Sequence, residues 1–151
     1  MRKLLLITLP ALALAVAALA FGATAGAKGT RSVKFTDTVV GASITDTQSA
    51  MSLHDSRLGN GAAVQTIKIT PTGGTDTTVA YFKTGSATSK DTFTIGQADA
   101  NGNAPLTGTG KDVKGTGKLK GITSTYTFSG TYNINTTRFT VKLVGTYKLP
   151  R

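Results

Sequence analysis

The residues of this chain that could perform acid–base chemistry are few and scattered. His54 is the only histidine, and it lies next to Asp55 and three residues before Arg57. A histidine close to a carboxylate is a common arrangement for general acid–base catalysis. Adjacent residues of a strand point to opposite faces, however, so His54 and Asp55 cannot readily form a dyad. We therefore interpret this cluster as structural and keep His54 and Arg57 as candidate ligand contacts.

Asp37 is the second candidate, because it shares a strand face with Phe35 and Val39. A lone carboxylate on a buried face costs several kcal/mol unless it is paired or neutralised. Two alternatives follow for Asp37. It faces a wet pocket, where it could bind or protonate a ligand, or it lies at a bulge or strand mouth and meets solvent. The second is the expectation for a lone carboxylate.

Other kinds of site lack the residues they need. The chain has no Cys, a single His and no Glu, because all seven acidic residues are Asp. Only an oxygen site built from scattered Asp could hold a metal ion. The segment from Gly110 to Gly115 is similar to a phosphate-binding loop, but Thr116 stands where the lysine belongs. We predict no catalytic set, no metal site and no cofactor.

Basic residues greatly outnumber acidic residues in this sequence. The 151 residues contain 17 Lys and Arg against 7 acidic residues, a net charge of +10. Nucleic-acid binding needs aromatic residues interleaved with charge on one exposed face. In this sequence the aromatic residues alternate in step with the apolar residues, so they are expected on the buried face of the strands. We expect no nucleic-acid partner, and a solvated basic surface with weak attraction to an anionic cell envelope.

The first 27 residues have the pattern of a secretory signal peptide. A basic start, Met1 to Lys3, precedes the apolar stretch Leu4 to Phe21, and small residues in the A-x-A pattern follow up to Ala27. An uncleaved anchor is the alternative, since the apolar stretch could nearly span a bilayer. Cleavage would leave residues 28–151, which have lost Arg2 and Lys3 and therefore carry 15 basic residues and a net charge of +8. We expect a secreted, bacterial protein with no transmembrane span in the mature chain.

Alternation of apolar and polar residues runs through most of residues 28–151. This period of two is typical of strands with one buried face, and no segment has a helical period. About eight strands with short connections, in a chain without disulfides, favour a sheet that closes on itself. We predict a single eight-stranded antiparallel β-barrel. The clearest expected strands lie near residues 33–39, 50–54, 64–70, 77–83, 89–96, 123–132 and 138–149, and the glycine segment begins at residues 106–110.

The last two strands predict which side chains face inward. Asn133 to Thr137 connects them as a hairpin loop, and Asn60-Gly61 is expected to be another turn. Glycines between Gly108 and Gly121 are expected at corners of the curled sheet. Tyr81, which alternates with Phe82, is a further candidate ligand contact. The aromatic residues expected in the barrel interior are Tyr126, Phe128, Tyr132, Phe139 and Tyr147.

Two segments resemble a known superfamily. Thr116-Gly117-Lys118-Leu119-Lys120-Gly121, followed by a strand ending Tyr126-Thr127-Phe128-Ser129-Gly130-Thr131-Tyr132, resembles the glycine turn and G-x-Y strand of the allene oxide cyclase and dirigent-like barrels. Secreted actinobacterial members are similar in the segments 55–62, 75–78, 81–82, 89–94 and 99–102.

The resemblance implies an eight-stranded barrel with a lined cavity. Plant members steer or catalyse ring closure and coupling of apolar or phenolic molecules. The cyclases use a glutamate that this chain lacks, whereas Asp37 matches the place of an acidic residue in dirigent proteins.

We expect a secreted barrel that binds a small apolar or phenolic molecule. The first alternative is a cyclase, isomerase or dirigent-type enzyme that acts on such a ligand through Asp37 or His54. The second alternative is a structural protein that associates with the cell envelope through its basic exterior.

Overall fold

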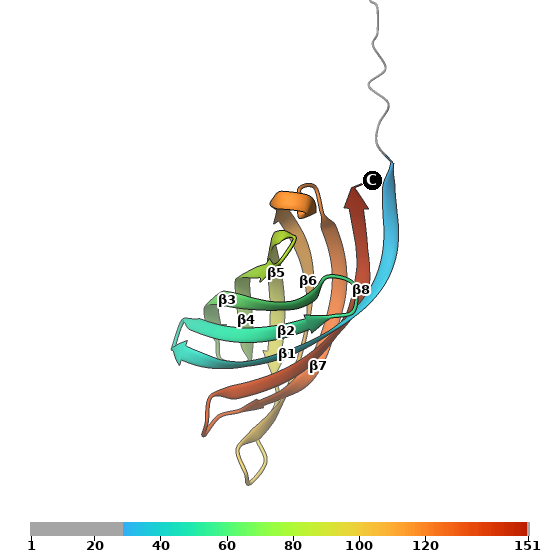
Figure 1. The fold of residues 1–151 in the computed structure, drawn as a ribbon. Helices are drawn as coiled ribbons and strands as arrows, with labels where there is room; N and C mark the ends of the chain where they lie inside the picture. The colour runs from blue at the N-terminus through green and yellow to red at the C-terminus, as the bar shows by residue number, and fades with distance from the viewer. Residues whose placement is uncertain (1–28, 151) are drawn as a thin grey trace, which may run out of the picture.

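The protein is an eight-stranded closed barrel in the described part of the chain. The computed structural model describes residues 29–150, apart from the side chain of Pro150, so the predicted signal peptide lies outside the described residues (Figure 1). The elements in chain order are β1 (Thr30–Thr45), β2 (Gln48–Asp55), β3 (Gly59–Thr70), β4 (Gly73–Phe82), β5 (Gly85–Ile95), β6 (Asn103–Gly115), the 3-10 helix η1 (Gly117–Leu119), β7 (Thr123–Asn133) and β8 (Arg138–Pro150).

Every strand pairs antiparallel with its neighbours in sequence, and β1 closes the barrel by pairing with β8. The closing register runs from Thr30 opposite Pro150 to Ala42 opposite Arg138. Within residues 29–150, closure leaves no unpaired sheet edge, which suits a sequence that contains no cysteine and therefore no disulfide. The predicted fold class is confirmed. Residues 29–150 contain no helix that could cross a membrane.

The alternation of β7 and β8 places side chains as the sequence predicted. Phe139 and Tyr147 are buried, whereas Thr140 is exposed. Tyr132 pairs with Phe139, and Phe128 pairs with Leu143, so the aromatic side chains lie on the same inner face. The predicted hairpin is confirmed, with its turn at residues 134–137.

The connection between β2 and β3 differs from the prediction. Asn60 and Gly61 lie inside β3, and the turn falls at residues 56–58. Asp55 ends β2, and its Oδ1 accepts hydrogen bonds from the backbone N–H groups of Arg57 (2.6 Å) and Leu58 (2.8 Å). An aspartate that bonds to the backbone two residues on nucleates a turn by itself, and this competes successfully with the Asn-Gly signal.

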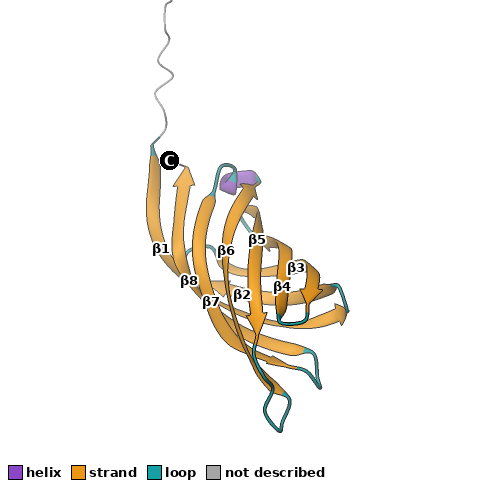
Figure 2. Cartoon of the chain, turned by 180° about the vertical axis from the view of Figure 1, so that it is seen from behind, coloured by secondary structure: helices purple, strands orange, loops and turns teal. Residues whose placement is uncertain are grey.

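One end of the barrel is closed by the segment between β6 and β7. Leu119 of η1 and Ile122 pack against Phe35, Ala87 and Tyr147 in a buried apolar cluster. Gly117 and Gly121 flank this turn with φ of +57° and +85°, a conformation that favours glycine. Figure 2 shows η1 at the end of the barrel where β1 begins and β8 ends.

Glycines opposite aromatic residues let rings lie over the sheet. Gly110 stands between Asp91 of β5 and Tyr126 of β7 in one cross-strand row. A Cβ on Gly110 would lie 1.8 Å from Asp91 Oδ1 and 2.5 Å from the Tyr126 ring. The sequence predicts Gly108 and Gly110 at corners of the curled sheet. Both lie instead within β6, where the missing side chains leave room for side chains of neighbouring strands.

Candidate functional site

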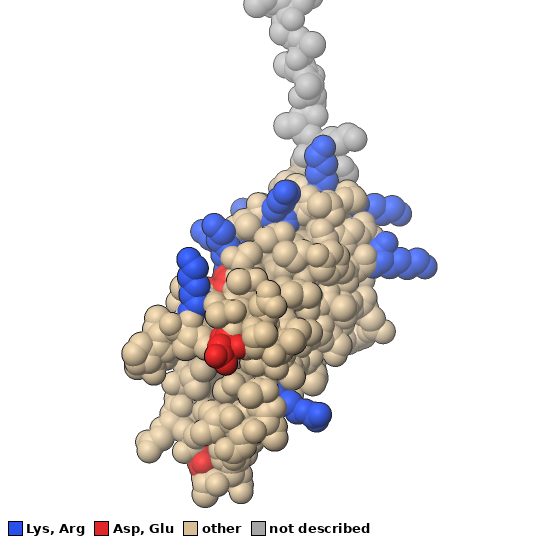
Figure 3. Space-filling view, turned by 90° about the vertical axis from the view of Figure 1, so that its left-hand side faces the viewer, with Lys and Arg blue, Asp and Glu red and all other residues tan. Residues whose placement is uncertain are grey.

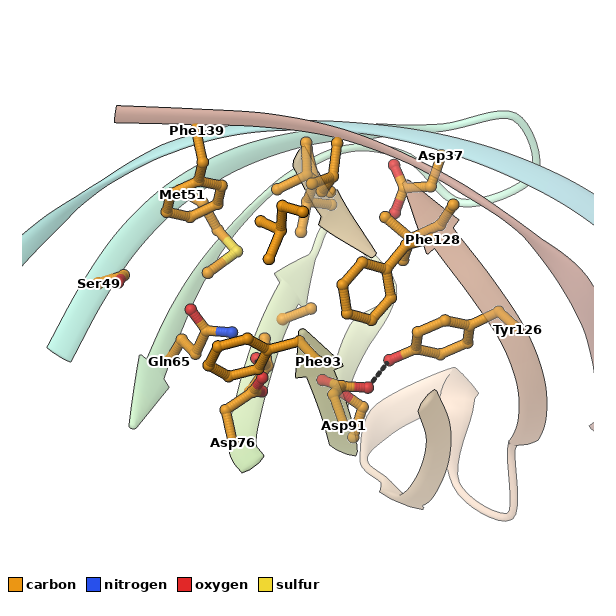
Figure 4. A pocket seen from close by; sticks show the side chains of 18 of the residues that line it. Asp37, Ser49, Met51, Gln65, Asp76, Asp91, Phe93, Tyr126, Phe128 and Phe139 are labelled. Carbon is orange, nitrogen blue, oxygen red and sulfur yellow. Dashed lines mark hydrogen bonds between the residues drawn. The ribbon is translucent and has the colours of Figure 1, made fainter. Parts of the chain in front are cut away.

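The barrel encloses a cavity of about 210 Å³ that is lined by residues of all eight strands. Most of the wall is apolar, and Figure 4 shows the Phe93, Phe128 and Phe139 rings around the same space. Ile69, near the end of β3, lines the cavity and is 61% exposed. Because Ile69 lies at the end remote from η1, the cavity opens to solvent there, and we call this end the mouth.

Carboxyl groups are concentrated inside the barrel. Asp46 and Asp99 lie in exposed loops, whereas the other five aspartates are on the inner side of the strands. Among the described residues, no Lys, Arg or His lines the cavity. The strand alternation has thus placed acidic residues inside and basic residues outside. The four aspartates of the cavity wall are Asp37, Asp76, Asp91 and Asp112.

Asp37 lies inside the barrel and not at a solvent-exposed mouth, which corrects the expectation from sequence. It is 5% exposed, faces the cavity, and its Oδ1 has no hydrogen-bond partner. Burial, reinforced by the negative charge of Asp55 directly opposite on β2, raises the pKa of Asp37 to about 7. The reason is register: position 37 has the inward parity of Phe35 and Val39, and no bulge interrupts β1 there.

Asp76 and Asp91 form a second acidic site on the opposite wall. They are direct cross-strand partners on β4 and β5. Tyr126 donates a hydrogen bond of 2.5 Å to Asp91 Oδ1, and Ser89 donates one of 3.0 Å to Oδ2. Burial and the adjacent charge of Asp76 raise the pKa of Asp91 to about 8, so this pair holds a proton at neutral pH.

Asp55 and Asp112 are the two remaining aspartates on the inner side of the strands. Asp55 is 1% exposed and accepts a hydrogen bond from the Tyr147 hydroxyl in addition to the two from its own turn. Burial raises the pKa of the Asp112 carboxyl. Burial also raises the pKa of the Tyr126 and Tyr147 hydroxyls, which therefore act as hydrogen-bond donors.

The sequence-predicted site residues divide into two groups. Tyr81 is 55% exposed on the outer surface and does not line the cavity, because Phe82 takes the inward position. His54 is exposed and its Nδ1 lies 2.6 Å from Asn60 Oδ1, while Arg57 Nε donates to the Lys34 carbonyl at 3.0 Å. Neither lines the cavity. Those that do are Asp37, Tyr126, Phe128, Tyr132, Phe139 and Tyr147.

Sequence reasoning missed most of the polar wall. Asp76, Asp91 and Asp112 line the cavity, as does Ser49, which is fully buried with no partner for its Oγ. The signal was available for Asp91, because it has the same parity as Phe93.

The arrangement can accept hydrogen bonds, donate protons and contact apolar surface. Within residues 29–150, no group of three or more His, Cys, Asp or Glu side chains is placed to hold a metal ion.

Comparison of this chain with family profiles, with curated proteins and with solved structures found no match. The resemblance to allene oxide cyclase and dirigent-like barrels accordingly stays a prediction.

Proposed function

We propose that this protein binds a small, mostly apolar molecule inside the barrel. The observation that carries the proposal is the cavity itself, which has apolar and aromatic walls, a few convergent polar groups and one mouth. Binding sites for small molecules have this composition. The predicted secretion and the family resemblance agree with a carrier or a sequestering protein.

The cavity volume bounds the size of the ligand. A dry protein cavity of about 150 Å³ accepts benzene, and pockets for drug-sized molecules begin near 300 Å³. At about 210 Å³, the cavity fits one aromatic ring with a short chain. A phenolic or phenylalkyl molecule satisfies both limits.

Native mass spectrometry of protein recovered from its source, without refolding, tests the proposal. We expect a bound small molecule that is lost on denaturation. Ala80→Leu should reduce binding of this molecule, because Ala80 lines the cavity and the larger side chain occupies part of it. Ala50→Leu is the matched control, since Ala50 is exposed on the outer surface. Equal binding by both variants would locate the ligand elsewhere and refute the proposal.

A second candidate function is proton transfer on the same ligand, as in an isomerase or cyclase. Asp37 favours it, because a carboxyl with a pKa of about 7 and a free oxygen can give and take a proton near neutral pH. Asp37→Asn should then abolish turnover of the ligand found by mass spectrometry. Undiminished turnover, or no chemical change in the ligand with native protein, would leave binding as the function.

A further inference from the structure

We propose that the ligand of the barrel is a small amphiphile whose polar end is a protonated amine, held by the Asp37 carboxylate. The inference rests on the proposed function, since it names the chemical class of ligand for the same cavity. The observations behind it are unpartnered polar atoms, the distribution of charge and the aromatic wall.

Two deeply buried polar side chains of the wall lack a partner within the described protein. They are Asp37, through Oδ1, and Ser49, through Oγ. A buried acceptor without a partner costs about 1–3 kcal/mol, so a ligand that donates hydrogen bonds gains this energy on binding. An ammonium group has three donors and no acceptor, which matches an ionised carboxylate.

The charges select against an anionic ligand. Four carboxyl groups line the cavity, and none of the described Lys, Arg or His residues does. The mouth loops carry Asp46 and Asp99, whereas Figure 3 shows Lys and Arg side chains gathered toward the opposite end, near the start of the described chain. The carboxyl groups of the cavity wall attract a cation into the barrel, although the basic residues Lys68 and Arg138 also lie toward the mouth, near the end of β3 and the start of β8. The described basic residues of the closed end are Arg31, Lys34, Arg57, Lys83, Lys114, Lys118, Lys120 and Lys148.

The titratable groups that face Asp37 from inside the barrel are acidic or phenolic, whereas its direct partner on β8 is the apolar Leu143. Asp55 lies opposite on β2, Asp112 reaches it from β6, and Tyr126 and Tyr147 line the cavity from β7 and β8. Asp76 and Asp91 line the far wall, while His54 lies on the outer surface of β2. Within residues 29–150, no cation therefore competes for the Asp37 carboxylate from inside the barrel.

Aromatic rings complete the site. Figure 4 shows Asp37 at one wall, Asp76 and Asp91 at the other, and the Phe93 and Phe128 rings projecting into the space between them. Ring faces attract a desolvated cation and contact an apolar body equally well. In mildly acidic solution the empty barrel keeps a proton on Asp37, and binding of an ammonium group releases that proton to solvent.

Titration calorimetry with three probes of one shape tests the inference: phenylpropylamine, phenylpropanol and phenylpropanoate. At about pH 8 the amine is protonated and Asp37 is ionised, so we expect the amine to bind about ten-fold more tightly than the alcohol and the carboxylate to bind most weakly. At about pH 5 the preference for the amine should disappear, because Asp37 is neutral. At about pH 6.5, where the empty barrel still holds the Asp37 proton in most molecules, heats measured in two buffers of different ionisation enthalpy should show proton release for the amine alone.

Asp37→Asn should remove the preference of the amine over the alcohol. Thr38→Asn is the matched control, because it introduces the same amide on the exposed outer surface and should keep the preference. If Asp37→Asn fails to fold, the pH dependence and proton release of native protein decide the question. Equal affinities for amine and alcohol at about pH 8 would overturn the inference and leave the proposed function intact. Failure of all three probes would overturn the inference, and ligand-free protein in mass spectrometry would separately overturn the proposed function.

Discussion

Buried carboxyl groups determine the pH range in which this barrel is most stable. Asp91 and Asp37 have pKa values of about 8 and about 7 in the folded protein, above the value of 3.8 for an unperturbed aspartate. The folded state therefore binds more protons than the unfolded state between these limits. The stability from these groups is fully present below about pH 4 and is lost as the pH rises through 7 and 8.

Replacement of Asp91 by Asn tests this pH dependence. We expect the free energy of unfolding of native protein, from urea titrations, to fall by several kcal/mol between about pH 5 and about pH 9. Asp91→Asn should remove a substantial part of the fall, because the amide does not ionise yet accepts the Tyr126 hydrogen bond. Thr92→Asn, on the exposed face, should behave as native protein. An unchanged pH profile in Asp91→Asn would assign the dependence to other groups.

Gly110 tests the contact between Tyr126 and Asp91 without touching either residue. A methyl group at this position would overlap both the Asp91 carboxyl and the Tyr126 ring, so Gly110→Ala should displace the tyrosine and cost about 1–3 kcal/mol of stability. Thr109→Ala, one residue earlier on the exposed face, should cost no more than about 0.5–1 kcal/mol. Thermal unfolding of both variants measures the difference, and equal losses would show that the glycine is not required for the contact.

The closed end and the mouth are made by different kinds of element. The closed end depends on η1, a single 3-10 turn whose Leu119 is buried with Ile122 in the apolar cluster beneath it. The mouth is surrounded by hairpin turns, two of which are joined because Asn133 Nδ2 and Asn135 Nδ2 both donate to the Asn101 carbonyl, at 3.1 and 3.2 Å. These two ends fix the direction from which the proposed ligand would enter.

The β7–β8 hairpin gives a stability test of the inward and outward faces. Phe139 is buried in the apolar cluster with Val39 and Leu53, so Phe139→Ala should cost about 3–5 kcal/mol. Thr140→Ala, on the exposed face, should stay within about 0.5–1 kcal/mol. Chemical denaturation compares the two variants. A total stability of about 5–15 kcal/mol means that the first change could prevent accumulation of folded protein, and equal losses would contradict the observed burial.

Residues 29–150 largely separate their charges, with five of the seven aspartates inside the barrel and the basic side chains outside. An exterior of this kind attracts anionic surfaces through long-range electrostatics, which salt screens over about 10 Å at 0.1 M. Attraction to an anionic cell envelope stays a prediction from the sequence, and this charge distribution is the reason to test it.

Vesicles that contain anionic lipid provide the measurement for this prediction. We expect co-sedimentation at low ionic strength that falls steeply as salt is added. Lys118 and Lys120 are exposed in and next to η1, and their replacement by Ala should weaken vesicle binding at low salt. Replacement of the exposed Thr107 and Thr109 by Ala should leave vesicle binding unchanged. Binding that does not respond to salt would argue against an electrostatic attachment.

The sequence by itself determined the fold class and the facing of the clearest strands. Alternation in residues 138–149 assigns Phe139 and Tyr147 to the interior, because the side-chain period of a strand is two and a one-residue slip would expose every apolar residue. It also showed that His54 and Asp55 point to opposite faces, as the structure confirms.

Only the tertiary structure decided what the cavity wall contains. Asp76, Asp91 and Tyr126 are far apart in sequence, and the cross-strand row that joins them passes over Gly110. Their approach depends on the register of three strand pairs, which no local pattern encodes. The burial of Asp37 was missed for the same reason: whether an inward carboxyl meets solvent depends on the closed end of the barrel, and that end is made by residues 117–122, some eighty positions along the chain.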